Sequence, residues 1–435
     1  MGNIILRGGH LIDPSQGIDE PKDVVIADGK IAKIISPGAN ASGREIDVTG
    51  RIVAPGLVDI HVHLREPGYE YKETIATGAE AAVAGGVTSV VAMPNTDPPP
   101  DTADAVRGFY KRAETAACHV YTTGAITRSR KGEQLAELVD LAVAGVVGFS
   151  DDGDPVGNTR TLLHAMEYSQ PIGLPIVAHC EVKDLAAGGH MHEGAVSAEL
   201  GIDGIPDIAE SLDVTRHIEL AKYAGCRLHI CHVSSAAAVE VIRRAKAEGV
   251  ANVTAETAPH YLALTDEAIR TYDTHAKMNP PLREDSDRAA LREALQDGTI
   301  DAIATDHAPH SPEEKNVEFD QAPFGIIGLE TSLGVCWTEL VATGALTPSQ
   351  LIEKMSVQPA RIHGLPAGTL AVGSVADVVV IDPTRRWTVP QRFRSKSRNS
   401  PFVGRELVGK AVLTLVAGVV RYEEAREPFA TLRVR

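Results

Sequence analysis

The chain has 435 residues, with 42 Lys or Arg against 58 Asp or Glu, and its formal net charge is −16. This acidic balance argues against nucleic acid as a partner, because a polyanion would be repelled. No apolar run reaches the roughly 18 residues of a membrane span. The start at Met1 has neither the basic region of a signal peptide nor a myristoylation motif, so we expect a cytoplasmic protein.

Short β runs separated by turn residues fill the first 53 residues. In one of them, Val24–Ala27 and Lys30–Ile35 flank the dipeptide Asp28-Gly29. An Asp-Gly pair between two such runs is typical of a two-residue turn, so this stretch predicts a hairpin.

A pair of histidines closes the next apolar run, which reads Val-Asp-Ile-His-Val-His from Val58 to His63. Side chains alternate along a strand, so His61 and His63 point to one side and suit a divalent metal. We place Arg65 two positions further along the same strand face, where its guanidinium can offer a two-pronged contact to a carboxylate.

Further short β runs end in His or Asp, and each places a metal donor where a strand stops. They are 175–179, 226–232 and 303–307. Helical patterns alternate with the β runs, at 72–84, 132–144, 212–224, 235–247 and 287–295. Such alternation indicates an α/β fold with a parallel sheet wrapped by helices. Donors at successive strand ends are how a (β/α)8 TIM-type barrel builds its active site, so we predict that barrel.

From about residue 369 the β texture of the N-terminus returns, for example at 376–381 and 411–416. We expect the two terminal β segments to form one small β-sandwich. The predicted division is therefore 1–54 and 366–435 for the sandwich and 55–365 for the barrel.

The stretch 310–328 is polar and charged at first and then rich in Gly. Over a barrel mouth it suggests a lid that excludes water, and a plain surface excursion is the alternative. The five cysteines are odd in number and scattered, which argues against a disulfide framework. Strand alternation should turn Cys180 and Cys231 away from the metal side.

The motifs HVHLREPG, GGVTSVVAMPNT, FSDDG, VAHCE, HICHVSS, KMNPPLR, ATDHAPH and PFGIIGLET follow one another along nearly the whole chain. In this order they resemble the amidohydrolase superfamily, and within it the bacterial type I dihydroorotases. The resemblance implies reversible hydrolysis of the cyclic amide of dihydroorotate to N-carbamoyl-aspartate, the third step of pyrimidine synthesis. It also implies a centre of one or two Zn²⁺ ions per subunit, although cobalt or manganese would fit the same donors.

The resemblance assigns His61 and His63 to a first metal and His179 and His232 to a second. Many amidohydrolases bridge the metals with a lysine at the fourth strand, but residues 146–153 contain none, and in type I dihydroorotases an aspartate stands in. The distance to the VAHC histidine selects Asp152 over Asp151 as that bridge. The implied substrate contacts are His63, Arg65, Asn95, Asn279, His310, Phe324 and Gly325.

Asp306 ends the last β run and is the candidate catalytic residue. It can touch the first metal, take a proton from the nucleophilic water and deliver it to the ring nitrogen. His260 belongs to a family-like motif and is left out of the metal set, while His229 and His307 are expected beside the ligands.

Two alternatives stay open. A hydantoinase, dihydropyrimidinase or allantoinase would cleave a similar ring, but the missing lysine and the presence of Arg65 and Asn95 argue against it. A catalytically silent assembly partner of aspartate carbamoyltransferase is the other, although every expected ligand position is filled. We expect at least a homodimer, and whether the chain also joins a complex with that carbamoyltransferase is left open.

Overall fold

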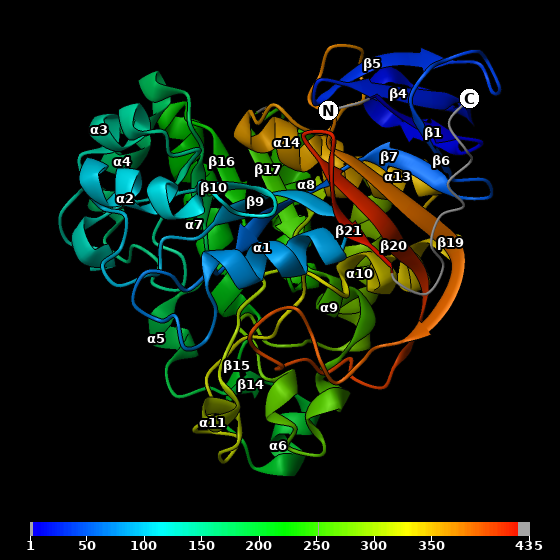
Figure 1. The fold of residues 1–435 in the computed structure, drawn as a ribbon. Coiled ribbons are helices and arrows are strands. Elements are labelled where there is room, and N and C mark those ends of the chain that lie inside the picture. Colours follow the sequence, from blue (N-terminus) through cyan, green and yellow to red (C-terminus); the bar gives the residue numbers. More distant parts are fainter. Residues whose placement is uncertain (1–2, 251, 425–435) are drawn as a thin grey trace.

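The computed structural model describes residues 3–250 and 252–424 (Figure 1). Strands from both ends of the chain share sheets beside the main body. The N-terminal strands are β1 (Ile4–Arg7), β2 (His10–Asp13), β3 (Ile18–Pro21), β4 (Asp23–Ala27), β5 (Lys30–Ile35), β6 (Arg44–Asp47) and β7 (Ile52–Pro55). The C-terminal ones are β19 (Val378–Thr388), β20 (Glu406–Val416) and β21 (Val419–Glu423).

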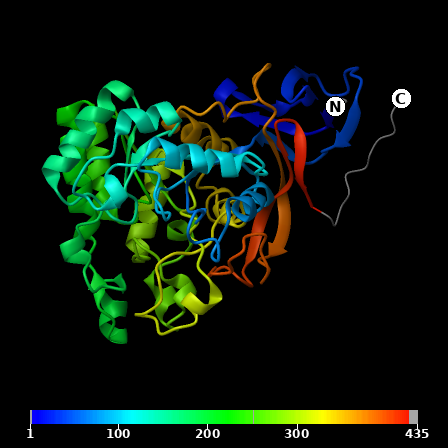
Figure 2. The ribbon, with the colours of Figure 1, turned by 60° about the vertical axis from the view of Figure 1, so that its left-hand side comes forward.

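The terminal strands form two sheets with a common apolar core. One sheet has the order β5-β4-β1-β6, and the other has the order β21-β20-β19-β7-β2-β3. In the second sheet β19 pairs antiparallel with β7, so the two chain ends meet there, as the blue and orange strands do in Figures 1 and 2. Leu6, Val53 and Leu413 are among the fully buried side chains of the shared core.

The predicted hairpin is confirmed, because β4 pairs antiparallel with β5. Its turn residues Asp28 and Gly29 have φ of 52° and 74°. A two-residue turn of this kind needs positive φ at both positions, which Asp tolerates and Gly adopts freely.

Short parallel strands alternate with helices through the middle of the chain. One parallel sheet has the order β10-β9-β8 and another the order β11-β12-β13-β16-β17-β18. Their bounds are β8 (Leu57–Val62), β9 (Val87–Ala92), β10 (His119–Thr122), β11 (Gly124–Ala125), β12 (Phe149–Ser150), β13 (Ile176–Ala178), β16 (Leu228–Ile230), β17 (Val253–Thr257) and β18 (Ala302–Ile303). A parallel bridge between Val62 and His307 connects the end of β8 to the segment after β18.

The longer helices lie between these strands in sequence. They are α1 (Ile75–Ala84), α2 (Ala103–Ala113), α3 (Leu138–Ala144), α4 (Thr159–Ile172), α7 (Ile208–Ala224), α8 (Ala236–Ala247) and α10 (Asp285–Asp297). The prediction of a helix from residue 132 was wrong for its first turns. Gly132 has φ of 72°, and Leu135 instead forms an isolated β-bridge with Thr127, so α3 begins only at Leu138.

Several shorter elements complete this part of the chain. They are α5 (Lys183–Ala186), β14 (Met191–His192), α6 (Ala195–Leu200), β15 (Gly204–Ile205), α9 (Pro259–Ala263), α11 (Pro312–Lys315), α12 (Ser332–Cys336), α13 (Pro348–Ile352) and α14 (Gln358–His363). All five cysteines are buried and free. Within the described residues no helix is both long and apolar enough to cross a membrane.

Candidate metal centre

The predicted metal ligands come together at the carboxyl ends of five parallel strands. His61 is the second-last residue of β8, and His63 directly follows that strand. Asp152, His179, His232 and Asp306 follow β12, β13, β16 and β18 in that order. Each of these residues is at most 7% exposed. The β8–β9 ladder shifts its register between Asp59 and Val62, directly before the second histidine. Bulges of this kind often re-aim side chains beside active sites.

The carboxylate of Asp152 lies at the middle of the cluster. Its Oδ1 is 3.4 Å from His61 Nε2, 3.8 Å from His179 Nδ1 and 3.7 Å from His232 Nε2. Its Oδ2 is 3.7 Å from His63 Nε2. One carboxylate therefore faces all four predicted imidazoles, which is the position that a bridging ligand needs.

Asp306 contacts the same cluster from the other end of the larger parallel sheet, because it follows β18 whereas Asp152 follows β12. Its Oδ1 is 3.0 Å from His63 Nε2 and 3.6 Å from His61 Nε2. The backbone of Asp306 has φ of 49° and that of His232 has φ of 35°. Non-glycine residues rarely adopt these values, and they concentrate at functional sites where the surrounding fold holds them in place.

The charges in the cluster depend on one another. Burial favours the neutral acid at Asp152, but the imidazoles of His61, His232 and His63 together outweigh burial and hold the pKa of that carboxyl well below its usual range. Burial also opposes a charged His61, yet the Asp152 carboxylate raises the pKa of that imidazole. Burial lowers the pKa of His179, and the adjacent His232 lowers it further. The buried carboxylates thus remain anionic and attract a cation.

A divalent metal fits these donors. Ligand atoms of His61, Asp152 and His232 lie within 4.8 Å of one another, and so do those of His61, His63 and Asp306. Among the described residues, His61 Nε2, His179 Nε2 and Asp152 Oδ1 are buried and have no hydrogen-bond partner. Imidazole and carboxylate donors in this number suit zinc and neighbouring divalent ions.

Glu256, which lies in β17, is a functional residue that the sequence reasoning missed. It is 1% exposed, its Oε1 accepts a hydrogen bond from His61 Nδ1 at 2.9 Å, and its Oε2 is 3.2 Å from His229 Nε2. Burial raises its pKa, but hydrogen bonds from His229 and His61 lower it to about 2. A carboxylate on the far ring nitrogen leaves His61 Nε2 free for a metal. A lone acidic residue inside the strand 253–257 was the available signal.

Asn95 and Asn279 lie beside the cluster, in contacts with other protein groups. His63 Nδ1 donates to Asn95 Oδ1 at 2.8 Å, so Asn95 orients a predicted ligand. Asn279 Nδ2 donates to Glu181 Oε1 at 2.9 Å, whereas Asn279 Oδ1 is buried without a hydrogen-bond partner among the described residues.

The placement of Arg65 on the strand face of His63 was wrong. β8 ends at Val62, and Arg65 has φ of 62°, so strand alternation no longer applies there. The guanidinium nevertheless reaches the site and is 8% exposed. Its Nε donates to the carbonyl of Pro309 at 3.2 Å, and one Nη lies 3.5 Å from His310 Nε2.

His310, Phe324 and Gly325 form a second group beside the guanidinium. His310 Nε2 donates to the carbonyl of Phe324 at 2.8 Å. Burial lowers the pKa of His310 to about 4, so the ring is neutral near pH 7. The amide of Gly325, predicted as a ring contact, donates at 2.9 Å to the carbonyl of Lys277.

Two residues that the sequence reasoning set aside lie against the cluster. His260 is 2% exposed, its Nε2 has no hydrogen-bond partner in the described chain, and burial together with the nearby His232 and His61 lowers its pKa to about 4. The expectation that Cys231 turns away was wrong, because its Sγ groups with the ligand atoms of His61 and Glu256. β16 ends at Ile230 and His232 has φ of 35°, so strand alternation no longer applies at Cys231.

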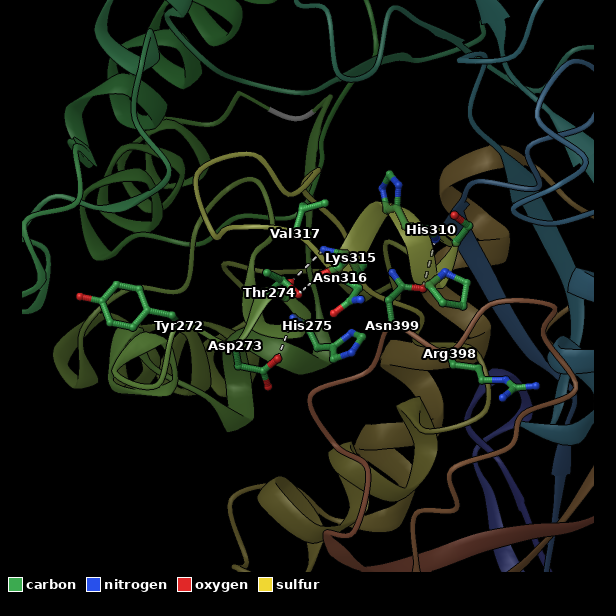
Figure 3. A pocket seen from close by; sticks show the side chains of 12 residues that line it. Tyr272, Asp273, Thr274, His275, His310, Lys315, Asn316, Val317, Arg398 and Asn399 are labelled. Carbon is green, nitrogen blue, oxygen red and sulfur yellow. Dashed lines mark hydrogen bonds between the residues drawn. The ribbon is translucent and has the colours of Figure 1, made fainter.

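Two hollows open beside the cluster. One of about 490 Å³ is lined by His310, Lys315, Arg398 and Asn399 among others, and Figure 3 shows these side chains gathered around it. A larger one, of about 1110 Å³, is lined by Asp154 and Glu181 among other residues. Both therefore border residues next to the predicted ligands and substrate contacts.

Comparison with known proteins places the whole chain in one group. The model of the amidohydrolase family matches residues 52–421. Dihydroorotases of Pelotomaculum thermopropionicum and Trichlorobacter lovleyi are 54% and 50% identical to the chain, over 96% of the chain in both cases and 98% and 99% of those proteins. Among solved structures, an L-hydantoinase (dihydropyrimidinase) of Arthrobacter aurescens has a TM-score of 0.89 at 30% identity and covers 100% of the chain and 98% of its own.

Proposed function

The chain belongs to the amidohydrolase family, and we propose that it is a dihydroorotase that reversibly hydrolyses the ring of dihydroorotate to N-carbamoyl-aspartate. The observation that carries the proposal is the Asp152 carboxylate among four buried imidazoles, with the Arg65 guanidinium beside them. The first group suits a metal that activates an amide, and the second suits a substrate that carries a carboxylate.

The proposed metal is zinc, one or two ions, held by His61, His63, Asp152, His179, His232 and Asp306. When bound, it supplies a Lewis acid for the scissile carbonyl and lowers the pKa of a water molecule. Asp306, 3.0 Å from His63, is the group that moves the proton from water to the ring nitrogen. Burial raises the pKa of this carboxyl, but the hydrogen bond from His63 and the charges of His61, His63 and His232 together lower it below its usual range, so the carboxyl is held anionic.

The proposed substrate site places the ring carboxylate at Arg65, Asn95 and His310. Asn279, with a buried carbonyl oxygen free of protein hydrogen bonds in the described chain, is proposed to face the ring, together with His63, Phe324 and Gly325. We also propose that 310–328 acts as the lid over this site. Lys277 Nζ donates to the carbonyl of Phe319 at 2.7 Å and Lys315 Nζ to that of Thr274 at 3.0 Å, so the stretch is tied at two points to residues outside it, which supports a closed position.

We infer that the parallel strands close into a (β/α)8 barrel of residues 55–365. Support comes from β10 running directly into β11 and from the Val62–His307 bridge, which link the ends of the two parallel sheets. Residues 1–54 and 366–435, as far as they are described, then make the small sandwich, which is consistent with the core shared by Val53 and Leu413. Residues 425–435 lie outside the described chain.

Further proposals concern partners and location. The small molecules bound would be dihydroorotate and N-carbamoyl-aspartate, and a cytoplasmic protein is expected. We predict at least a homodimer, and a complex with aspartate carbamoyltransferase is a further possibility to test by mixing the two proteins. Gel filtration at micromolar concentration should give the mass of a dimer or larger. A strict monomer would contradict the prediction.

The decisive experiment is hydrolysis of dihydroorotate by the purified chain, with added zinc and with chelator. Hydantoin and allantoin are the control substrates, because the solved relative at 30% identity is a hydantoinase. Zinc-dependent loss of dihydroorotate alone is the expected result. Turnover of hydantoin or allantoin instead would overturn the proposal, and silence even with aspartate carbamoyltransferase present would favour an assembly role.

A further inference from the structure

A segment far from the parallel strands in sequence, 394–399, reaches the substrate side of the site. Two carboxylates, one of them fully buried, hold its start. Glu330 Oε1 accepts hydrogen bonds from the backbone amides of Arg394 at 2.8 Å and Ser395 at 3.1 Å. Glu73, which is 0% exposed, accepts from the amide of Lys396 at 3.0 Å and from the Ser395 hydroxyl. The segment is therefore fixed to the body of the protein before it reaches the site.

Asn399 is the last residue of this segment, and it is 1% exposed. Its Oδ1 accepts from the amide of His310 at 3.1 Å, a bond drawn in Figure 3. Its Nδ2 donates to the carbonyls of Ala308 and Gly325, both at 3.0 Å. Its own carbonyl accepts from the amide of Ile327 at 3.0 Å.

The chemistry of these partners defines which residue can stand at 399. Backbone amides only donate and carbonyls only accept, so the orientation of the Asn399 amide follows from its surroundings. An aspartate has the same shape but would set an oxygen against the carbonyls of Ala308 and Gly325. An amide is thus required, and a hydrophobic packing role alone would not require it.

The two backbone segments that Asn399 joins, around Ala308 and around Gly325, also hold the side chains proposed to bind the substrate carboxylate. Arg65 Nε donates to the carbonyl of Pro309, which lies between Ala308 and His310. His310 Nε2 donates to the carbonyl of Phe324, which precedes Gly325. A shift between the two segments would therefore move the guanidinium and the imidazole together.

We propose that Asn399 is a positioning residue, which holds segments 308–310 and 325–327 together so that Arg65 and His310 are aligned for the carboxylate of the substrate. This inference rests on the proposed dihydroorotase function. Asn399 contacts no predicted metal ligand in the described structure, so its loss should affect substrate binding and spare the metal.

The test compares Asn399→Asp and Asn399→Ala with Ser397→Ala as the matched control. Ser397 is a buried polar residue of the same segment whose hydroxyl donates to the carbonyl of Lys72 at 2.7 Å, and in the described chain it makes no hydrogen bond to either joined segment. For each variant we would measure kcat and KM for dihydroorotate, bound zinc and Tm. An unpaired buried polar group costs enough to predict a rise in KM of about 10-fold or more for Asn399→Asp.

The expected pattern is a raised KM in both Asn399 variants, with kcat within about 3-fold of wild type, unchanged zinc, and a wild-type KM in Ser397→Ala. Should Asn399→Asp fail to fold, Asn399→Ala provides the same comparison. An unchanged KM in a folded Asn399 variant, or an equal rise in Ser397→Ala, would overturn the positioning role alone. A wild-type chain that leaves dihydroorotate intact would instead overturn the proposed function and this inference with it.

Discussion

Adjacent carboxylates at residues 151 and 152 have opposite surroundings. Asp151 Oδ1 accepts from the amides of Ile126 at 2.9 Å and Thr127 at 3.2 Å, and burial raises its pKa to about 7. Asp152 instead faces imidazoles that keep it anionic. The first carboxyl supports the turn and the second supplies charge to the cluster, although the two differ by only one position in sequence.

This contrast predicts different results for two substitutions. Asp152→Ala should lose both bound metal and turnover, because it removes the carboxylate that faces four imidazoles. Asp151→Asn should keep its metal, since Asp151 contacts Ile126 and Thr127 instead. Metal analysis and dihydroorotate assays on both variants check this. Full activity with unchanged metal in Asp152→Ala would contradict the bridging role.

Arg65 should affect substrate binding without affecting the metal. Arg65→Lys keeps the positive charge but lacks the planar fork and the Nε bond to Pro309. We expect KM for dihydroorotate to rise by about 10-fold or more, as loss of a charge-assisted contact implies. Steady-state kinetics and metal analysis are the measurements, and loss of metal in this variant would show that its role is wrongly assigned.

At the scale of elements, local capping fixes the loop that carries Asp152. This loop runs from β12 to α4, and Asn158 ends it as the N-cap of α4, where its Oδ1 accepts from the amides of Arg160 and Thr161 at 3.0 and 3.2 Å. α4 itself ends at Ile172, and its C-cap Gly173 has φ of 79°. Such caps satisfy backbone groups that a helix end leaves unpaired.

The N-cap can be tested with a matched pair of variants. Asn158→Ala removes the capping oxygen and should lower the free energy of unfolding by about 1 kcal/mol. Asn158→Asp keeps an acceptor at the same place and should stay close to wild type. Urea unfolding of the three proteins measures the difference. Equal losses in both variants would mean that the side chain does more than cap α4.

At the scale of the whole molecule, the candidate centre brings distant parts of the chain together. His63 and Asp306 are 243 positions apart in sequence, yet His63 Nε2 lies 3.0 Å from Asp306 Oδ1. Asp152 and Asp306 are buried carboxylates whose negative charge a bound cation would balance. A metal that binds only the folded state therefore stabilises the molecule as well as the site.

Removal of metal should consequently lower both activity and thermal stability. We expect a chelator to lower Tm and abolish turnover, and added zinc to restore both. Zinc at about 100 times its dissociation constant should add about 2.7 kcal/mol to the free energy of unfolding. Calorimetry with and without zinc measures this, with Asp152→Ala as the control that should not respond. A Tm that ignores zinc in the wild type would contradict metal binding at this cluster.

Part of this fold could be predicted from local pattern. The Asp28-Gly29 hairpin and the alternation of short strands with helices depend on residues close in sequence, so periodicity and turn chemistry indicate them. The donors at strand ends were visible for the same reason, and the structure brings them together. The start of α3 was missed, because the pairing of Leu135 with Thr127 competes with helix formation there.

The sequence by itself determined which donors the chain carries and where strands and turns place them, because these depend on neighbours along the chain. Tertiary structure alone decided the surroundings of each donor. The left-handed backbone of Arg65, the carboxylate of Glu256 behind His61 and the three bonds of Asn399 all depend on distant segments. No local periodicity encodes such contacts, because they form only when the folded chain brings those segments together.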